Sequence, residues 1–354
     1  MTDSKTDIYS MTEPELTEYF VSIGEPKFRA RQTFSAVSQG LSISEMTNLS
    51  KELRQRLLDS TLDTLPRVRE KLVSKIDGTV KYLFELYDGA CIESVLMKYK
   101  HGNTICISSQ VGCRMGCKFC ASTIGGKERD LLPSELLGQI TVAARDSGER
   151  ISNVVMMGIG EPLDNYDNVI KFLRLVNDEG GINIGYRHIS LSTSGVVPGI
   201  LRLAEEELPI TLSISLHAAS DERRSEIMPI NKKWGIDELL SACVAYYKKT
   251  GRRISFEYTL ISGKNDSPDD ARLLASVLKT AFRGTGAPIH VNLIRVNEVK
   301  ETGFTAGSVG SANAFAEMLN SQGVVATVRR RLGADVNAAC GQLRRKAMIA
   351  EKDN

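Results

Sequence analysis

The sequence predicts an α/β protein: a partial (β/α)6-type barrel that carries a small N-terminal helical accessory domain and a strand hairpin extension. From Thr104 onward, stretches rich in Val, Ile and Leu alternate with amphipathic, helix-like stretches, which is typical of parallel strands buried on both faces. The residues before about position 75 show mostly helical patterns. From about Arg67 to Met97 the pattern turns extended, with a turn at Asp88–Gly89. We therefore divide the chain into 1–75 (accessory domain), 76–100 (hairpin), 101–335 (barrel) and 336–354 (C-terminal segment).

The accessory domain is expected to contain three helices. They begin near Thr12, Lys27 and Ser50, and Thr12 has the side chain of an N-cap. The basic residues Lys27, Arg29 and Arg31 allow two interpretations. Either the domain contacts a macromolecular substrate through them, or it packs as a cap on the barrel.

The hairpin is predicted from two runs, V-K-Y-L-F-E-L-Y (Val80–Tyr87) and C-I-E-S-V-L-M-K-Y (Cys91–Tyr99). Glu93 lies between Ile92 and Val95 in the second run. A carboxylate in such a strand usually faces solvent, so we expect Glu93 on the solvent side.

Six further strands are predicted, each followed by a helix. They start near Thr104, Ile151, Arg187, Ile210, Ile254 and Ile289, and a seventh covers Val324–Arg329. Ser134, Asp164 and Ser267 are expected to cap the intervening helices. A doubly wound sheet would show the same alternation. We favour the barrel because polar residues follow the strands at their carboxyl ends, where barrel sites lie.

Composition narrows the class of protein only modestly. The 354 residues are 42% hydrophobic and 25% charged, as in ordinary globular proteins. No apolar run reaches the ~20 residues that span a bilayer, and the N-terminus lacks a signal-peptide pattern, so we expect a cytoplasmic protein without a membrane partner. The net charge of +2 identifies no partner. Two basic clusters, at 329–331 and 344–346, either neutralise phosphates or form a solvated tail.

A cysteine-rich stretch directly follows the first barrel strand. Cys113, Cys117 and Cys120 are spaced C-x3-C-x2-C, and Cys106 precedes them. Three close thiolates suit an iron–sulfur cluster that leaves one iron for an outside ligand. A zinc site with Cys106 as the fourth ligand remains open. Disulfides fit poorly because the chain looks intracellular.

Polar residues stand at the ends of successive strands. They are Gly160 and Glu161, Ser192 and Thr193, Ser215 and His217, and Asn292. Glycines there let backbone approach a ligand, and Glu161 can accept hydrogen bonds from a ligand ammonium group. His217 by itself is more often a structural histidine than a catalytic one.

Three cysteines lie outside this stretch. Cys340 has Ala338, Ala339 and Gly341 as neighbours, which leave its thiol accessible if the segment covers the barrel mouth. Otherwise it is a small buried cysteine. Cys91 and Cys243 are assigned to packing.

These motifs carry a resemblance. The C-x3-C-x2-C spacing with Phe119 before the last cysteine resembles the cluster motif of radical S-adenosylmethionine enzymes. C-I-S-S-Q-V-G-C-R-M-G-C-K-F-C-A-S-T, M-G-I-G-E-P-L-D-N, R-H-I-S-L-S-T-S-G, S-L-H-A, M-P-I-N, R-R-I-S-F-E-Y, H-V-N-L-I and D-V-N-A-A-C-G-Q-L are together similar to the RlmN/Cfr family. The family methylates adenosine carbons in RNA, and the A-S-T-I-G-G run is more similar to the RlmN branch. That branch acts on adenine carbon 2 in 23S rRNA and some tRNAs, whereas Cfr-type enzymes act on carbon 8 of the same rRNA adenosine.

The resemblance implies roles for individual residues. It implies that a 4Fe–4S cluster is held by Cys113, Cys117 and Cys120. It implies that S-adenosylmethionine is bound by Gly160, Glu161, Ser192, Ser215, Leu216, His217 and Asn292. It implies that the RNA chemistry is carried by Cys340, Cys106 and the base Glu93.

The resemblance also implies a sequence of steps that uses two S-adenosylmethionine molecules per turnover. The first methylates Cys340, and the second yields a radical that takes a hydrogen from this methyl group. The thiomethylene group adds to adenine, Glu93 accepts a proton, and Cys106 attacks Cys340 to form a disulfide and release the RNA. An external one-electron reductant and a thiol reductant are then needed, and nothing demands an oligomer. Alternatives are carbon-8 methylation, a radical enzyme acting on a small molecule, and a non-catalytic four-cysteine zinc module that binds RNA.

Overall fold

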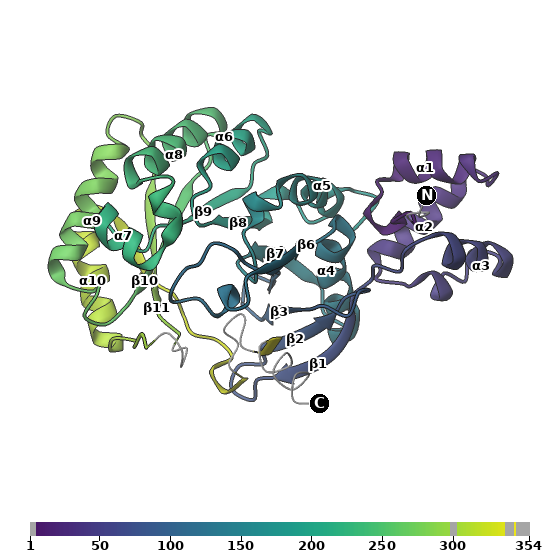
Figure 1. Cartoon of the computed structure of the whole chain (residues 1–354), viewed down its shortest axis with the longest axis horizontal. Helices are drawn as coiled ribbons and strands as arrows, with labels where there is room; N and C mark the ends of the chain where they lie inside the picture. Colours follow the sequence, from purple (N-terminus) through teal and green to yellow (C-terminus); the bar gives the residue numbers. More distant parts are fainter. Residues whose placement is uncertain (1–4, 298–302, 337–342, 345–354) are drawn as a thin grey trace.

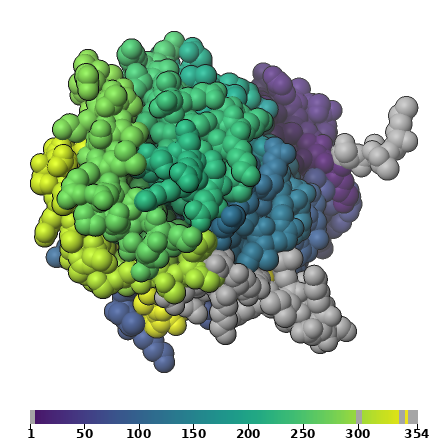
Figure 2. Space-filling model, turned by 60° about the vertical axis from the view of Figure 1, so that its left-hand side comes forward, coloured from purple at the N-terminus to yellow at the C-terminus, as the bar shows by residue number. Residues whose placement is uncertain are grey.

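A computed structural model of the protein describes residues 5–297, 303–336 and 343–344. Its first helices are α1 (Glu13–Ser22), α2 (Phe28–Ser38) and α3 (Lys51–Ser60), close to the predicted ranges. Thr12 caps α1 as predicted, because its hydroxyl accepts from the Glu15 amide while the Glu15 carboxylate accepts from the Thr12 amide at 2.8 Å. The apolar side chains of these helices belong to the same buried cluster as those of the barrel. The helices lie at the opposite end of the molecule from α10 (Figures 1 and 2).

One ten-stranded sheet organises the rest of the chain. Its strands are β1 (Arg67–Val73), β2 (Val80–Glu85), β3 (Cys91–Met97), β4 (Asn103–Cys106), β7 (Ile151–Met156), β8 (Ile189–Thr193), β9 (Thr211–Ser215), β10 (Ile254–Leu260), β11 (Ile289–Arg295) and β12 (Val325–Val328), and they follow one another in this order across the sheet. The short strands β5 (Gln110–Gly112) and β6 (Lys127–Asp130) form a separate antiparallel pair.

The strand order decides between the two architectures that the sequence left open. From β4 to β12 every neighbouring pair is parallel, and spatial order equals chain order. A doubly wound sheet would reverse its order at a switch point. Because right-handed crossovers in a single direction place all helices on one face, the sheet is of the barrel type. Its edges are β1 and β12, which makes the barrel a partial one.

The crossover helices lie around the outside of the sheet (Figure 1). They are α4 (Pro133–Ser147), α5 (Tyr166–Asn177), α6 (Val197–Glu205), α7 (Asp221–Ile227), α8 (Ile236–Thr250), α9 (Pro268–Ala281) and α10 (Val309–Ser321). No helix among the described residues is both long and apolar enough to cross a membrane.

One of the three predicted helix caps is confirmed. The Ser267 hydroxyl accepts from the Asp270 amide and caps α9. The prediction for Ser134 is wrong because Pro133 starts α4 one residue earlier. The prediction for Asp164 is also wrong, since it ends a 3-10 turn and Asn165 is the N-cap of α5.

The hairpin joins the main sheet, with β1 added at its outer edge. β3 pairs with β2 on one side and with β4 on the other, and all seven residues of β3 are buried. The expectation that Glu93 faces solvent is therefore wrong, because only 1% of it is exposed. On the opposite face of β3, the Ser94 hydroxyl donates to Gln139 of α4 at 2.7 Å, so both faces of this strand are covered.

Candidate active site

The three cysteines of the C-x3-C-x2-C motif lie in the loop between β5 and β6. Cys113 and Cys117 are buried, and Cys120 is half-buried. The loop is fixed at both ends, because the Cys113 amide donates to the Gly126 carbonyl at 3.0 Å and the Lys118 amide donates to the Ile227 carbonyl at 2.9 Å. The strand-to-loop placement predicted for these thiols is thus found.

The three thiols interact electrostatically with one another. Burial raises the pKa of Cys113 to about 12, and the charge of Cys120 adds to this shift. Burial also raises the pKa of Cys117, with further contributions from Cys120 and Cys113. Thiolate ligands must lose their protons on metal binding, so such a set stays protonated until a strongly bound cation replaces the protons. Three adjacent, desolvated thiols on one loop fit the ligand set of a 4Fe–4S cluster.

Cys106 is packed apart from these three thiols. It lies against Val95 and Met97, whereas Cys117 and Cys120 pack with Ala218 and Met228. Within the described part of the chain, no group of three or more His, Cys, Asp or Glu side chains is placed to hold a single metal ion. This geometry gives no support to the four-cysteine zinc site.

The loop after β7 is hydrogen-bonded to the segment that links β4 to β5. Its amides at Gly158 and Ile159 donate to the Ile107 carbonyl and the Ser108 hydroxyl, both at 3.0 Å. Gly160 has a φ of +111°, and a Cβ there would lie 2.6 Å from the Ser109 hydroxyl oxygen. Glycine at position 160 is therefore required by contact with the protein itself, and not only by a ligand.

Glu161 braces the next strand end. One carboxylate oxygen accepts from the Ser194 amide at 2.6 Å, and the other accepts from the Leu163 amide at 3.0 Å. Burial raises the pKa of this carboxyl, while the two amides act against the shift. Because the side chain is 2% exposed and used internally, its main role in the structure is to join the ends of β7 and β8.

Arg224 of α7 joins the ends of β8 and β9. It is fully buried, and its guanidinium donates to the carbonyls of Ser194, Ser215 and Leu216 at 2.6, 3.1 and 3.0 Å. Burial lowers the pKa of Arg224 to about 10. Ser192 and Ser215 remain half-buried at these ends, so their hydroxyls are the accessible polar groups of the two strands.

His217 follows β9 in the left-handed region, with a φ of +56°. Its Nδ1 accepts from the Thr259 amide at 2.9 Å, which places the proton of the neutral ring on Nε2. Burial lowers the pKa of His217 to about 3, and the Arg224 charge adds to the effect. The ring packs edge-on against Phe119 of the cysteine loop, with centroids 4.9 Å apart. His217 is thus a neutral, packed histidine beside the cysteines rather than a base.

Asn292 of β11 completes the row of predicted strand-end residues. It is half-buried, and its side-chain nitrogen donates to the buried carboxylate of Glu257 at 2.6 Å. Asn292 thus lies in the middle of β11 rather than at its end, while His217, which follows β9, contacts Phe119 of the cysteine loop.

A second group of predicted residues lies on one face of the hairpin. Cys106 is opposite Val95 in the register of β3 and β4, so it shares a face with Glu93 two positions away. Glu93 forms a buried ion pair with Lys81, with 3.1 Å between Nζ and Oε2, and also accepts from the Arg344 amide at 2.6 Å. Cys340 is outside the described residues.

The described residues on both sides of Cys340 in the chain contact this part of the molecule. Leu343 packs with Leu83 and Cys91, and Leu332 packs against the cluster that contains Cys106. Asp335 accepts from the Ser74 hydroxyl at 2.6 Å and from the Lys75 amide at 2.8 Å. Leu332, Asp335 and Leu343 are thereby held against the hairpin.

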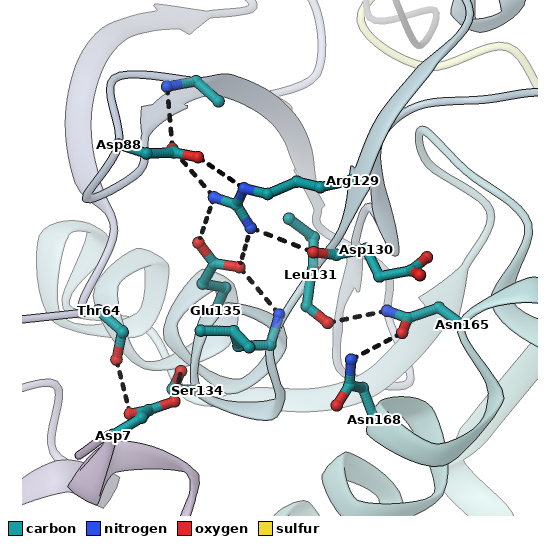
Figure 3. Close-up of polar contacts among 12 residues, drawn as sticks. Asp7, Thr64, Asp88, Arg129, Asp130, Leu131, Ser134, Glu135, Asn165 and Asn168 are labelled. Carbon is teal, nitrogen blue, oxygen red and sulfur yellow. Dashed lines mark hydrogen bonds and ion pairs between the residues drawn. The ribbon is translucent and has the colours of Figure 1, made fainter. Parts of the chain in front are cut away.

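Figure 3 shows the polar network that connects the cysteine loop to the hairpin and to the N-terminal helices. Arg129 of β6 donates to Asp88 at the hairpin turn at 2.6 and 3.0 Å and to Glu135 of α4 at 2.7 and 2.8 Å. Asp7 accepts from the hydroxyls of Thr64 and Ser134 at 3.0 and 2.8 Å. The chain leaving the cysteine loop is therefore fixed to both flanking regions.

Sequence reasoning missed Lys81, Arg224 and Glu257. A signal for Lys81 existed, since opposite charges at 81 and 93 lie on the same face once the Asp88–Gly89 turn sets the register. The sequence did not indicate that Arg224 is buried, because D-E-R-R-S-E is typical of a solvent-exposed helix. Glu257 belongs to R-R-I-S-F-E-Y, which was noted as a motif but given no role.

Comparison with known proteins adds independent information. A model of the radical SAM superfamily matches residues 107–274, and a model of the ribosomal RNA large subunit methyltransferase N-terminal domain matches residues 6–62. A protein of Alkaliphilus oremlandii, named probable dual-specificity RNA methyltransferase RlmN, is 54% identical over 343 residues, which cover 97% of this chain and 98% of that protein. A Clostridium botulinum protein of the same name is 54% identical and covers 96% of both chains. The crystal structure of a radical SAM methyltransferase from Sphaerobacter thermophilus matches with a TM-score of 0.89 and 41% identity, over 95% of this chain and 98% of that one.

Proposed function

Because this chain belongs to the RlmN family of radical SAM RNA methyltransferases, we propose that it methylates carbon 2 of adenosine in 23S rRNA and in a subset of tRNAs. The observation that supports the proposal is the shared face of the hairpin, where Cys106 and Glu93 lie together and where Arg344, four residues after Cys340 in the chain, contacts Glu93. Two of the three residues that the reaction needs outside the cysteine motif, Cys106 and Glu93, share this face, and Cys340 lies outside the described residues.

Cys113, Cys117 and Cys120 would hold the 4Fe–4S cluster. When bound, the cluster and S-adenosylmethionine supply the one-electron chemistry that a polar side chain lacks. The S-adenosylmethionine site is assigned to Gly160, Glu161, Ser192, Ser215, Leu216, His217 and Asn292. The Glu161 and His217 side chains serve the protein internally, so these residues act mainly by shaping the site, while Ser192, Ser215 and Asn292 offer half-exposed polar groups.

Cys340 is proposed to carry the methyl carbon, which forms a bond to the adenine carbon and stays joined to Cys340 through its carbon–sulfur bond. For this step the methyl group would lose one hydrogen atom and the adduct one electron, and the one-electron chemistry of bound S-adenosylmethionine and cluster would take up both. Glu93 accepts the proton from the adenine carbon. The Cys106 thiolate then attacks the Cys340 sulfur: the disulfide bond forms, the carbon–sulfur bond breaks, and its electron pair passes to the carbon, which takes a proton to become the methyl group. Two S-adenosylmethionine molecules are used per turnover, and external reductants restore the thiols and supply the electron.

Lys81 gives Glu93 a defined role in this scheme. The ammonium group lies 3.1 Å from the carboxylate in a site that is almost closed to water. The ion pair fixes the position of the carboxylate that is proposed to take the proton. The Arg344 amide donates to the other carboxylate oxygen and so fixes the orientation of the carboxylate as well.

The accessory domain is proposed to contact the RNA, with the four-part domain division as predicted. Lys27 and Arg31 are exposed and available for phosphate contacts. Arg29 is committed differently, since its guanidinium donates to Gln32 and to the Asn48 carbonyl at 2.9 and 3.0 Å. We expect a monomer to be sufficient for activity.

Replacement of Cys106 by Ala tests the thiol assignment. Resolution then fails, so the protein should accumulate as a covalent adduct with its RNA substrate, detected by denaturing gel and mass spectrometry. Cys91→Ala is the matched control, because Cys91 lies on the same face of β3 but packs with Leu83 and Leu343. Clean turnover by Cys106→Ala would refute the assignment.

The position of the methyl group is tested on the product. The cluster-loaded protein is incubated with unmodified 23S rRNA fragments and tRNA, and the modified nucleoside is compared with 2-methyladenosine and 8-methyladenosine standards. We expect the 2-methyl isomer from both RNAs. The 8-methyl isomer would assign the chain to the alternative reaction.

A further inference from the structure

Glu257 of β10 is a buried carboxylate at the centre of the strand-end residues. It is 4% exposed and is the register partner of Ser215 on one side and of Asn292 on the other. Its carbonyl accepts from the amides of Leu216 and His217 at 3.0 and 3.3 Å. Its carboxylate accepts from the Asn292 side chain at 2.6 Å. Glu257 therefore contacts three of the residues assigned to S-adenosylmethionine.

The other contacts of the carboxylate come from within the barrel. Its second oxygen accepts from the Ser255 hydroxyl at 3.2 Å. Burial raises the pKa of the Glu257 carboxyl, and the positive charge of Arg329 acts against this rise. The Arg329 guanidinium lies 3.6 Å from the Met157 sulfur. The side chain is thus held in place from several strands and has little freedom to rotate.

A fixed acceptor decides how the Asn292 amide is oriented. An asparagine amide has an acceptor end and a donor end of nearly equal shape, so an isolated side chain can turn either end toward a ligand. Donation of the Asn292 nitrogen to Glu257 fixes the nitrogen inside the barrel and leaves the carbonyl oxygen as the group presented outward. The site then offers an acceptor there and not a donor.

We propose that Glu257 is a positioning residue for S-adenosylmethionine: it fixes Asn292 as a hydrogen-bond acceptor for a hydroxyl or amino group of the nucleoside and holds the Leu216–His217 backbone beside it. This inference rests on the proposed function, since it assumes that the strand ends bind S-adenosylmethionine.

The test measures binding of radiolabelled S-adenosylmethionine to the cluster-loaded protein by equilibrium dialysis, without reductant so that the ligand stays intact. Glu257→Met has a similar volume but no acceptor, and we expect its affinity to fall about tenfold or more. Glu257→Gln keeps an acceptor for Asn292 and a partner for Ser255, so it should weaken binding far less than Glu257→Met. Asp270→Asn, which alters a buried carboxylate that caps α9 on the outside, is the control for general destabilisation.

An exchange of donor and acceptor sharpens the test and also covers the case in which Glu257→Met does not fold. Asn292→Asp places two carboxylates against each other and should weaken binding. In the double variant Asn292→Asp/Glu257→Gln, the new amide donates to the new carboxylate, so the bond is restored with an acceptor still facing outward. We expect the double variant to bind more tightly than Asn292→Asp alone.

The outcomes separate the two levels of the argument. Wild-type protein that binds no S-adenosylmethionine overturns the proposed function itself. Three other results would overturn only the role of Glu257. The first is wild-type affinity in Glu257→Met, and the second is an equal loss of affinity in Glu257→Met and Glu257→Gln. The third is a double variant that binds no more tightly than Asn292→Asp.

Discussion

The two halves of the candidate active site are built in different ways. Around the cysteine loop, β7 to β10 are joined mainly by hydrogen bonds between side chains and the main chain: Arg224 donates to carbonyls, Glu161 accepts from the Ser194 amide, and His217 accepts from the Thr259 amide. On the hairpin face, the central contact is between two side chains, the buried pair of Lys81 and Glu93. The first half is a rigid set of strands joined through the main chain, whereas the second pairs two buried side chains beside Arg344, which comes from the other end of the sequence.

The difference matters for what each half tolerates. Most side-chain substitutions leave hydrogen bonds to the main chain intact. The strands around the cysteine loop therefore depend on only a few side chains, each of which makes several such bonds. A buried ion pair does not tolerate the loss of one partner, because the remaining side chain is then charged and desolvated. Substitutions in the two halves should therefore have different effects. Those in the cysteine loop should reduce bound metal, and those in the ion pair of the hairpin face should reduce folding stability.

The largest effect is expected at the cysteine loop. Cys117→Ser should abolish methylation and reduce bound iron well below the roughly four atoms of an intact cluster, because three thiolates are the minimum ligand set. Iron and sulfide analysis of anaerobically purified protein measures this. Cys243→Ser, a buried thiol of α8 that belongs to the main apolar core, should keep its iron. Full iron content in Cys117→Ser would remove this cysteine from the ligand set.

The next effect is expected at the ion pair. Lys81→Met should lower the free energy of unfolding by about 3–5 kcal/mol, since Glu93 is left buried with its charge uncompensated. Urea denaturation of the metal-free protein measures this value. The surface pair of Lys71 with Asp146 supplies the control, and Lys71→Met should cost about 1 kcal/mol or less.

A compensating change sharpens the same comparison. Replacing both partners, in Lys81→Met/Glu93→Leu, should recover much of the lost stability because no buried charge remains. Methylation should stay absent in this double variant, because the proposed base is gone. If Lys81→Met is as stable as the wild-type protein, the hairpin face is more hydrated than the burial of the two side chains indicates.

The two halves also differed in how well the sequence predicted them. The strand ends could be found because glycines, serines and cysteines recur at fixed places in a strand–helix alternation, so Ser192, Ser215 and Asn292 were placed by local pattern. The alternation alone also allowed a doubly wound sheet, and the polar residues after the strands favoured the barrel. The burial of Glu93 could not be found in this way, because it depends on a C-terminal segment about 250 residues away that covers the hairpin. Arg224 was missed because its neighbours are charged, and only the tertiary fold turns its side chain inward.

The smallest effect is expected where the C-terminal segment is fastened to the hairpin. The pKa of Asp77 is lowered to about 2: burial alone would raise it, but hydrogen bonds from the Gly333 amide and from Thr79 outweigh burial. Since this folded-state pKa lies below the ordinary value of 3.8, the stabilisation is complete above pH 3.8 and is lost as the pH falls through about 2.

Asp77→Asn should therefore cost about 1 kcal/mol or less at pH 7, and the difference from wild type should disappear as the pH falls from about 4 to about 2. Urea denaturation of the metal-free protein across this range measures the difference. Asp59→Asn on the exposed face of α3 is the control. The Gly333 contact fixes the chain only seven residues before Cys340. The same variant should therefore lower the methylation rate by a larger factor than its loss of folding stability alone would cause. A rate equal to that of wild type would mean that the Glu93 and Leu343 contacts alone keep the segment over the hairpin.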